Sequence, residues 1–143
     1  MVDRVRAAAP AAQPQALCDA SRLQDDGLAY VFDVVHLREP ARAFALRFDG
    51  RVVAYLNRCV HVPAEMDWLP GQFLDSERAF IICSIHGAVY EPRTGRCAGG
   101  PCGRGRLTPI EVLERDGRVY WYPSPDIQPA GAESNRPRRT AHP

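Results

Sequence analysis

The residues best suited to chemistry form two short segments that each pair a cysteine with a histidine. Cys59 is followed two residues later by His61, and Cys83 is followed three residues later by His86. Both spacings suit a tight loop at the tip of a hairpin. Two such loops that face each other could present two sulfur and two nitrogen donors to one site. Thiolates are soft donors and imidazoles intermediate, so this set predicts zinc or iron–sulfur chemistry and not magnesium or calcium binding.

The order of the donors departs from the usual zinc pattern. A Cys2His2 zinc site usually groups its cysteines together and its histidines together, whereas each segment here carries one of each. In a mixed-ligand [2Fe-2S] centre, two cysteines hold one iron and two histidines hold the other. Zinc held by the same four side chains remains the alternative.

The residues around both segments resemble the Rieske family. Asn57–His61 is similar to the first cluster loop of that family. Cys83–Tyr90 is similar to the second loop, with a glycine directly after the histidine, and the Thr94–Gly95 turn follows. Gly99–Pro101 stands where the family has a proline-containing loop that caps the cluster. The resemblance covers roughly residues 15–122. It implies one [2Fe-2S] cluster with four ligands, which are Cys59, His61, Cys83 and His86.

Positions near the second loop bear on the reduction potential. High-potential members of the family have a serine two residues after the second histidine, a tyrosine four residues after it, and a disulfide between their two loops. The matching residues here are Ala88, Tyr90, and the pair Ala64 and Ile85, so only the tyrosine is kept. The resemblance therefore implies a low-to-middle potential within the Rieske range, near that of soluble Rieske ferredoxins. The residues expected to tune the cluster are Gly87, Ala88, Tyr90 and Pro101.

Short apolar runs separated by turns predict an all-β fold. Asp-Gly pairs at Asp49–Gly50 and Asp116–Gly117 are strong hairpin indicators, and no long helical pattern is present. We expect a small antiparallel sandwich or barrel with the cluster-binding loops grouped at one end. The predicted strands are 15–18, 30–36, 43–48, 51–56, 79–82, 88–90, 107–113 and 118–122.

Composition divides the 143 residues into three parts. Residues 1–14 are predicted to be a disordered arm, 15–122 the Rieske-like domain, and 123–143 a disordered tail rich in proline and arginine. A net charge of +1 gives no reason to expect binding to nucleic acid or an anionic membrane. No membrane-spanning run or signal peptide is evident, so a cytoplasmic protein is expected.

The remaining cysteines and one histidine are given structural roles. Cys18 is predicted to be a buried small apolar residue, and His36 a solvated residue at a strand end. Cys97 and Cys102 flank the predicted cap loop. Two thiols are favoured for this pair in a reducing cytosol, with a disulfide as the alternative that a glycine-rich loop permits.

Two aromatic residues lie between the ligand segments. Trp68 and Phe73 are predicted to pack locally, with docking of a partner as the alternative.

The resemblance implies an electron carrier and not an enzyme. No nucleotide-binding fingerprint and no second catalytic domain are evident in the sequence. A ferredoxin of this kind would accept single electrons from a reductase and pass them to an oxygenase or another redox enzyme, with no small-molecule substrate of its own. The alternatives are a redox-sensing module, regulated by cluster loss or by oxidation of Cys97 and Cys102, and a structural zinc domain.

Overall fold

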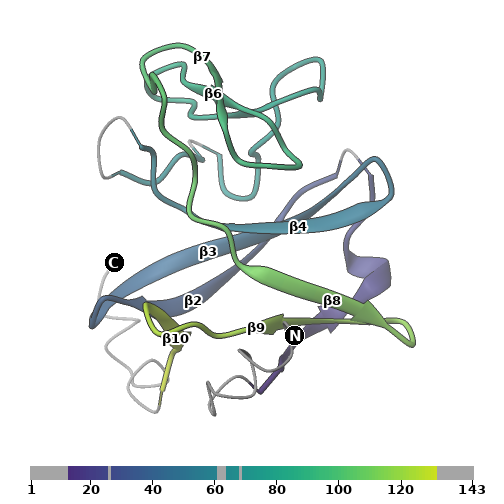
Figure 1. The fold of residues 1–143 in the computed structure, drawn as a ribbon. Coiled ribbons are helices and arrows are strands. Elements are labelled where there is room, and N and C mark those ends of the chain that lie inside the picture. The colour runs from purple at the N-terminus through teal and green to yellow at the C-terminus, as the bar shows by residue number, and fades with distance from the viewer. Residues whose placement is uncertain (1–12, 26, 61–63, 68, 132–143) are drawn as a thin grey trace, which may run out of the picture.

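The computed structural model describes residues 13–25, 27–60, 64–67 and 69–131. In these residues the only helical element is the short 3-10 helix η1 (Ala20–Arg22), and the strands pair antiparallel in three sheets (Figure 1). The predicted all-β class is confirmed. None of the described helical segments has the length and apolarity needed to cross a membrane.

Two sheets form the base of the molecule. One has the order β10-β2-β3-β4 and the other β1-β9-β8, and they face each other in Figure 1. Backbone hydrogen bonds from Leu56 to Thr108 and from Ile110 to Ala54 join β4 to the segment before β8 and curl the two sheets toward a half-barrel. The strands are β1 (Gln15–Asp19), β2 (Tyr30–His36), β3 (Glu39–Phe48), β4 (Arg51–Leu56), β8 (Glu111–Arg115), β9 (Arg118–Tyr122) and β10 (Ile127–Pro129).

The Asp-Gly hairpins form as predicted. Asp49–Gly50 joins β3 to β4 with φ angles of 56° and 81°, and Asp116–Gly117 joins β8 to β9 with 53° and 79°. Positive φ at both central residues matches the right-handed twist of the flanking strands. The first of these hairpins delivers the chain directly into the first cysteine–histidine segment.

Several strands differ from the prediction. The strand predicted at 107–113 is β8 at Glu111–Arg115, because residues 107–110 only bridge to β4, and the strand predicted at 79–82 is reduced to residues 81–82. β3 begins at Glu39, because Leu37 and Arg38 alone make the turn from β2, with φ angles of 51° and 72°. The glycine-rich segment after residue 95 contains the short strand β7 (Cys97–Gly99). The predicted disordered tail from residue 123 contains β10, which pairs with β2 and buries Ile127. Residues 1–12 and 132–143 lie outside the described part of the chain.

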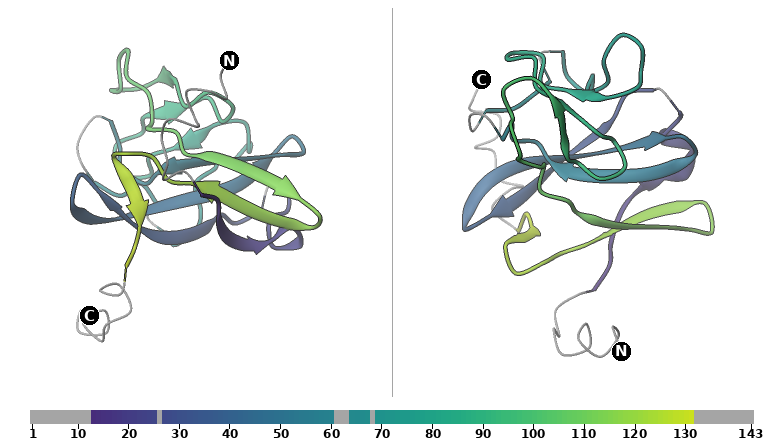
Figure 2. Two further views of the ribbon diagram at one scale, coloured as in Figure 1. Left: turned by 60° about the horizontal axis from the view of Figure 1, so that its bottom comes forward. Right: turned by 45° about the horizontal axis from the view of Figure 1, so that its top comes forward.

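A third, smaller sheet packs on the base. It consists of β5 (Ile81–Ile82), β6 (Val89–Tyr90) and β7 (Cys97–Gly99), and it lies above β3 and β4 in Figure 1 and in both views of Figure 2. The predicted arrangement, with the cysteine–histidine loops grouped at one end of a β base, is therefore confirmed for the described residues.

Aromatic contacts fix the small sheet to the base. The rings of Phe44 in β3 and Phe73 stack with centroids 3.7 Å apart. Phe73 was predicted to pack locally, and it is instead buried against β3 of the base, while Trp68 is outside the described residues. Tyr55 in β4 donates a 2.7 Å hydrogen bond to the carbonyl of Pro92. Burial raises the pKa of Tyr55 to about 12, which keeps its hydroxyl protonated as a donor.

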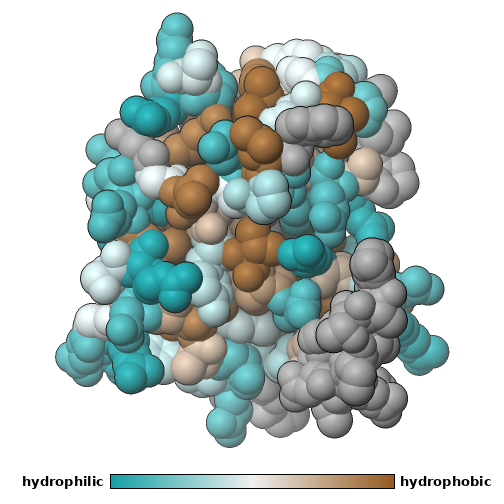
Figure 3. All heavy atoms as spheres, turned by 180° about the vertical axis from the view of Figure 1, so that it is seen from behind, coloured by the Kyte–Doolittle hydropathy of each residue, from teal (hydrophilic) through white to brown (hydrophobic). Residues whose placement is uncertain are grey.

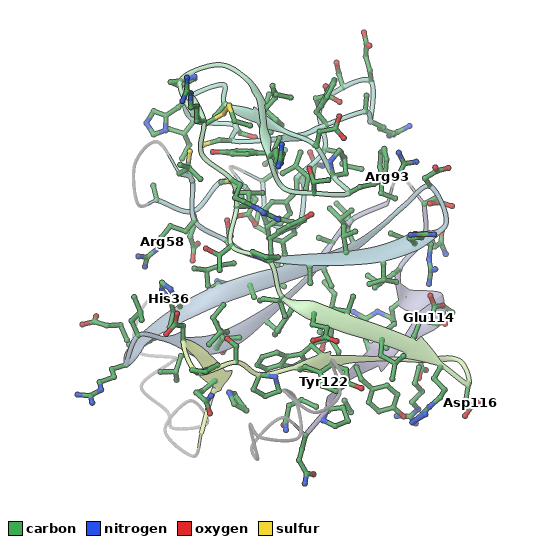
Figure 4. The ribbon with its side chains drawn as sticks, viewed as in Figure 1. His36, Arg58, Arg93, Glu114, Asp116 and Tyr122 are labelled. Carbon is green, nitrogen blue, oxygen red and sulfur yellow. A yellow bond between two sulfur atoms is a disulfide. The ribbon has the colours of Figure 1, made fainter. Side chains whose placement is uncertain are left out.

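Arg47 joins the two sheets of the base. Its guanidinium donates two hydrogen bonds to the carboxylate of Glu114 in β8, at 3.0 and 2.9 Å, and one each to the carbonyls of Leu23 and Ala20. Glu114 is labelled in Figure 4, on β8. The hydrogen bonds from Arg47 lower the pKa of the Glu114 carboxyl. A bidentate pair of this kind stabilises more than a typical surface ion pair.

We predict that Glu114→Gln lowers the free energy of unfolding at pH 7 by about 1 kcal/mol, after allowance for solvent screening of a partly exposed carboxylate. Because the folded-state pKa of Glu114 is depressed, its contribution is present at neutral pH and is lost as the pH falls through that pKa. Wild type and variant should converge in urea unfolding curves measured in acid, below that folded-state pKa.

Glu39→Gln, at the exposed start of β3, is the matched control and should change stability little. An equal loss in both variants, or a difference for Glu114→Gln that persists in acid, would contradict the assigned role of the Arg47–Glu114 pair.

Candidate metal centre

Each predicted ligand loop is closed at its neck by the same backbone hydrogen bond. The N–H of Cys59 donates to the carbonyl of Ala64 at 2.9 Å, and the N–H of Cys83 donates to the carbonyl of Ala88 at 2.8 Å. In both loops the acceptor is an alanine five residues after the cysteine. His61, which the sequence places in the first loop, lies outside the described residues.

Three of the four predicted donors come together. The Sγ atoms of Cys59 and Cys83 and a ring nitrogen of His86 all lie within 4.8 Å of one another. Both cysteines are buried, whereas His86 is exposed. Figure 4 shows sulfur atoms gathered at the end of the molecule beyond β3 and β4, on the same side as the labelled Arg58.

The chemistry of these donors fits a soft or intermediate metal. Two thiolates and an imidazole suit zinc or iron–sulfur ligation. Burial raises the pKa of the Cys83 thiol, so the apo side chain keeps its proton at neutral pH. Metal binding would displace this proton, because the thiolate is the form that binds metal.

Asn57 and Asp67 shape the first loop and were not predicted as functional residues. The buried Asn57 side chain accepts a 2.8 Å hydrogen bond from the N–H of Met66 and donates at 2.9 Å to Asp67. Asp67 in turn accepts the N–H of Gly71 at 3.0 Å. A buried amide must find such partners, and here they tie the two ends of the loop together. The one sequence signal that could have identified this role is the position of Asn57, two residues before the cysteine of the first loop.

Tyr90 connects the two loops. Its hydroxyl accepts a 3.1 Å hydrogen bond from the N–H of Val60 and lies 3.5 Å from the Sγ of Cys59. Because the hydroxyl accepts from Val60, its own proton is available to the sulfur. Burial raises the pKa of Tyr90, so the proton stays in place. Ala88 is buried nearby and carries no hydroxyl to add a second such donor.

A third loop, residues 99–105, packs against both ligand loops. A Cβ atom on Gly100 would lie 2.6 Å from the carbonyl oxygen of Gly87, and one on Gly105 would lie 2.3 Å from the Cγ1 of Val60. Glycine is therefore needed at both positions for this close approach. Pro101 follows Gly100 and is exposed.

Cys97 and Cys102 are joined by a disulfide. The preference for two thiols, which rested on an expected reducing compartment, is wrong in this structure. β7 and the turn after it bring the two Cα atoms to 5.7 Å, within the range that a disulfide spans. Cys18 is partly buried and packs against the core of the base, consistent with its predicted apolar role.

Comparison with models of protein families shows which family the chain belongs to. The sequence model of the Rieske [2Fe-2S] domain matches residues 13–122. The chain belongs to the Rieske family. A Rieske domain holds one [2Fe-2S] cluster, and the donor chemistry described above is compatible with that group. No curated protein sequence matches the chain.

Solved Rieske structures share the fold. The ferredoxin of carbazole 1,9a-dioxygenase from Nocardioides aromaticivorans IC177 is 22% identical, with a TM-score of 0.63 over 78% of this chain and 99% of that one. A chain in a complex of reduced oxygenase and oxidized ferredoxin of carbazole 1,9a-dioxygenase is 24% identical, with a TM-score of 0.59 over 76% and 92%. The terminal oxygenase from the same Nocardioides is 18% identical, with a TM-score of 0.60 over 83% of this chain but 32% of the oxygenase.

We predict that Tyr90→Phe lowers the midpoint potential by roughly 50 mV, which is near a tenfold change in the one-electron equilibrium. The hydroxyl proton next to Cys59 withdraws charge from the sulfur, and this effect is stronger when the bound centre carries the extra electron. Spectroelectrochemical titration would measure the shift.

Tyr55→Phe is the matched control, because it removes a buried tyrosine hydroxyl that bonds a carbonyl instead of a cysteine. Its potential should equal that of wild type. A shift of the same size in both variants would mean that Tyr90 acts only through the packing of the small sheet.

Proposed function

We propose that the protein is a Rieske-type ferredoxin that carries single electrons between a reductase and an oxygenase or another redox enzyme. Cys59, His61, Cys83 and His86 are the proposed ligands. The observation that carries the proposal is the uneven burial of the described donors, with two buried sulfurs and one exposed imidazole in a Rieske domain. When bound, a [2Fe-2S] cluster supplies one-electron oxidation and reduction.

The residues of the chain have distinct proposed roles. Cys59 and Cys83 hold their sulfurs away from water, which limits attack by solvent on the metal–sulfur bonds. Tyr90 directs a proton toward Cys59. The exposed His86 ring places the redox centre near the surface, where a partner protein can approach.

The comparisons support a carrier role. This chain aligns with 99% of the Nocardioides ferredoxin but with 32% of the terminal oxygenase. The matched part of the oxygenase is therefore a minority of that protein. The overlap with nearly the whole of a ferredoxin supports a carrier, and a separate oxygenase or similar enzyme is its proposed acceptor.

Metal content and electron paramagnetic resonance test the proposed centre. Anaerobically purified protein should contain about two irons and two sulfides per chain, the stoichiometry of one [2Fe-2S] cluster. The dithionite-reduced protein should give a rhombic spectrum of mixed nitrogen and sulfur ligation, with a midpoint potential below about +200 mV. A folded, colourless protein that contains zinc would overturn the proposal in favour of a structural zinc domain.

Exposed apolar side chains lie near His86, on the face where we propose that electrons leave the protein. Val60 and Ile85 stand next to ligand positions in the two loops, and Leu69 lines a shallow hollow with Ile85, Gln72 and Ser84. Figure 3 shows hydrophobic side chains gathered in the upper part of the molecule, at the end that carries the β5–β6–β7 sheet. We propose that this face contacts the redox partner, because it adjoins the exposed His86.

We predict that Ile85→Asp slows electron transfer to a partner oxygenase by about tenfold or more, since a charge in an apolar contact costs roughly 1–3 kcal/mol. Stopped-flow oxidation of the reduced protein at several partner concentrations would measure the effect. The midpoint potential should be measured beside the rate, because a carboxylate one residue before His86 is expected to lower it. The rates of the two proteins are then compared at equal driving force.

Leu37→Asp provides the control, because Leu37 is similarly exposed (60% against 48% for Ile85) but lies at the β2–β3 turn of the base. It should transfer electrons as wild type does. Equal slowing by both substitutions would remove the support for this docking face.

A further inference from the structure

The Cys97–Cys102 disulfide closes the base of the third loop. Cys97 lies in β7 directly opposite Tyr90 of β6. The N–H of Cys97 donates to the carbonyl of Gly105, and the N–H of Gly105 donates to the carbonyl of Cys102, both at 2.9 Å. The two backbone hydrogen bonds and the disulfide therefore close the third loop at the same place, next to the ligand loops.

The third loop contacts each ligand loop through backbone or branched side-chain atoms. Gly100 lies against Gly87 and Ala88, immediately after His86, and Gly105 lies against Val60, immediately after Cys59. The contact of Gly100 is to backbone atoms, which cannot move aside without moving the second ligand loop, and the contact of Gly105 is to the Val60 side chain of the first. Displacement of residues 99–105 would therefore remove support from both ligand loops at once.

We propose that the Cys97–Cys102 disulfide is a covalent clamp on the cluster-binding end, and that its reduction loosens the grip of both ligand loops. The inference rests on the ligands assigned under the proposed function. The bridge lies within the third loop, whereas the positions that would join the two ligand loops directly are Ala64 and Ile85. The disulfide is not part of either ligand loop. It acts by fixing the third loop, which packs against both of them.

The chemistry of release requires a dithiol reductant, such as a dithiol-containing redox protein. A thiolate of the reductant attacks the sulfur of Cys97, which is partly exposed, and the bond to the nearly buried Cys102 sulfur breaks. The second thiol of the reductant then closes its own disulfide. Two electrons and two protons pass to the protein, and Cys97 and Cys102 become thiols.

The test compares wild-type protein with Cys97→Ser/Cys102→Ser, both with a loaded centre verified by iron content and by electron paramagnetic resonance. Release of iron to a chelator, followed by loss of visible absorbance, should be at least about tenfold faster in the double variant, since a short disulfide loop restricts the open state by this order. Trypsin cleavage after Arg104, in the third loop, should also accelerate in protein without metal.

Cys18→Ser is the control for loss of a cysteine, because Cys18 packs against the core of the base. Unfolding of the base, followed by far-ultraviolet circular dichroism, should be similar in all three proteins. Alkylation and mass spectrometry would verify that wild-type Cys97 and Cys102 are protected before a dithiol is added and modified afterward.

Three results would overturn the clamp. In the first, Cys97 and Cys102 of wild-type protein handled in air react as thiols. In the second, iron is released at the same rate with and without the disulfide. In the third, trypsin cleaves the third loop equally fast with and without it. If the double variant did not fold, wild-type protein treated with a dithiol and then freed of it would supply the same comparison. A wild-type protein without iron would contradict the proposed function and not the clamp, since the cleavage assay needs no metal.

Discussion

One hydroxyl group links the two ligand loops at the cluster-binding end. Tyr90 comes from the strand that leaves the second ligand loop, yet its oxygen binds the backbone of the first loop and lies beside Cys59. Two loops separated by more than twenty residues in sequence are held in register by this contact. Because Tyr90 is fully buried, its hydroxyl needs both partners, and any movement of one loop relative to the other would leave it unsatisfied.

The base supplies the rigidity that this contact requires. Phe44 and Tyr55 project from neighbouring strands of one sheet. They contact segments that adjoin the small sheet, Phe44 by stacking on Phe73 and Tyr55 by a hydrogen bond to Pro92. Gly95 completes the junction, because a Cβ there would lie 2.8 Å from the Tyr55 ring. The Thr-Gly turn that resembles the family pattern therefore also has a packing reason in this chain.

Local features were the most predictable from the sequence. The Asp-Gly hairpins and the strands β2, β4 and β9 depend on residues close together in the chain, and they formed with the predicted bounds. Asn57 and Asp67 escaped prediction because their partners are brought near only by the folded loop. β10 was missed because its proline-rich composition indicates disorder, although Ile127 gains enough burial against β2 to order it. The state of Cys97 and Cys102 was misjudged because it was argued from compartment and not from the loop that brings them together.

The uneven burial of the donors also bears on the side from which a cluster could be inserted. Cys59 and Cys83 are closed off from behind by the base and by Tyr90, while the His86 ring faces outward. Under the proposed function, iron and sulfide would enter on the side of the exposed His86, which is also the face proposed for partner contact. A scaffold that loads the protein and an enzyme that draws electrons from it would then compete for one surface.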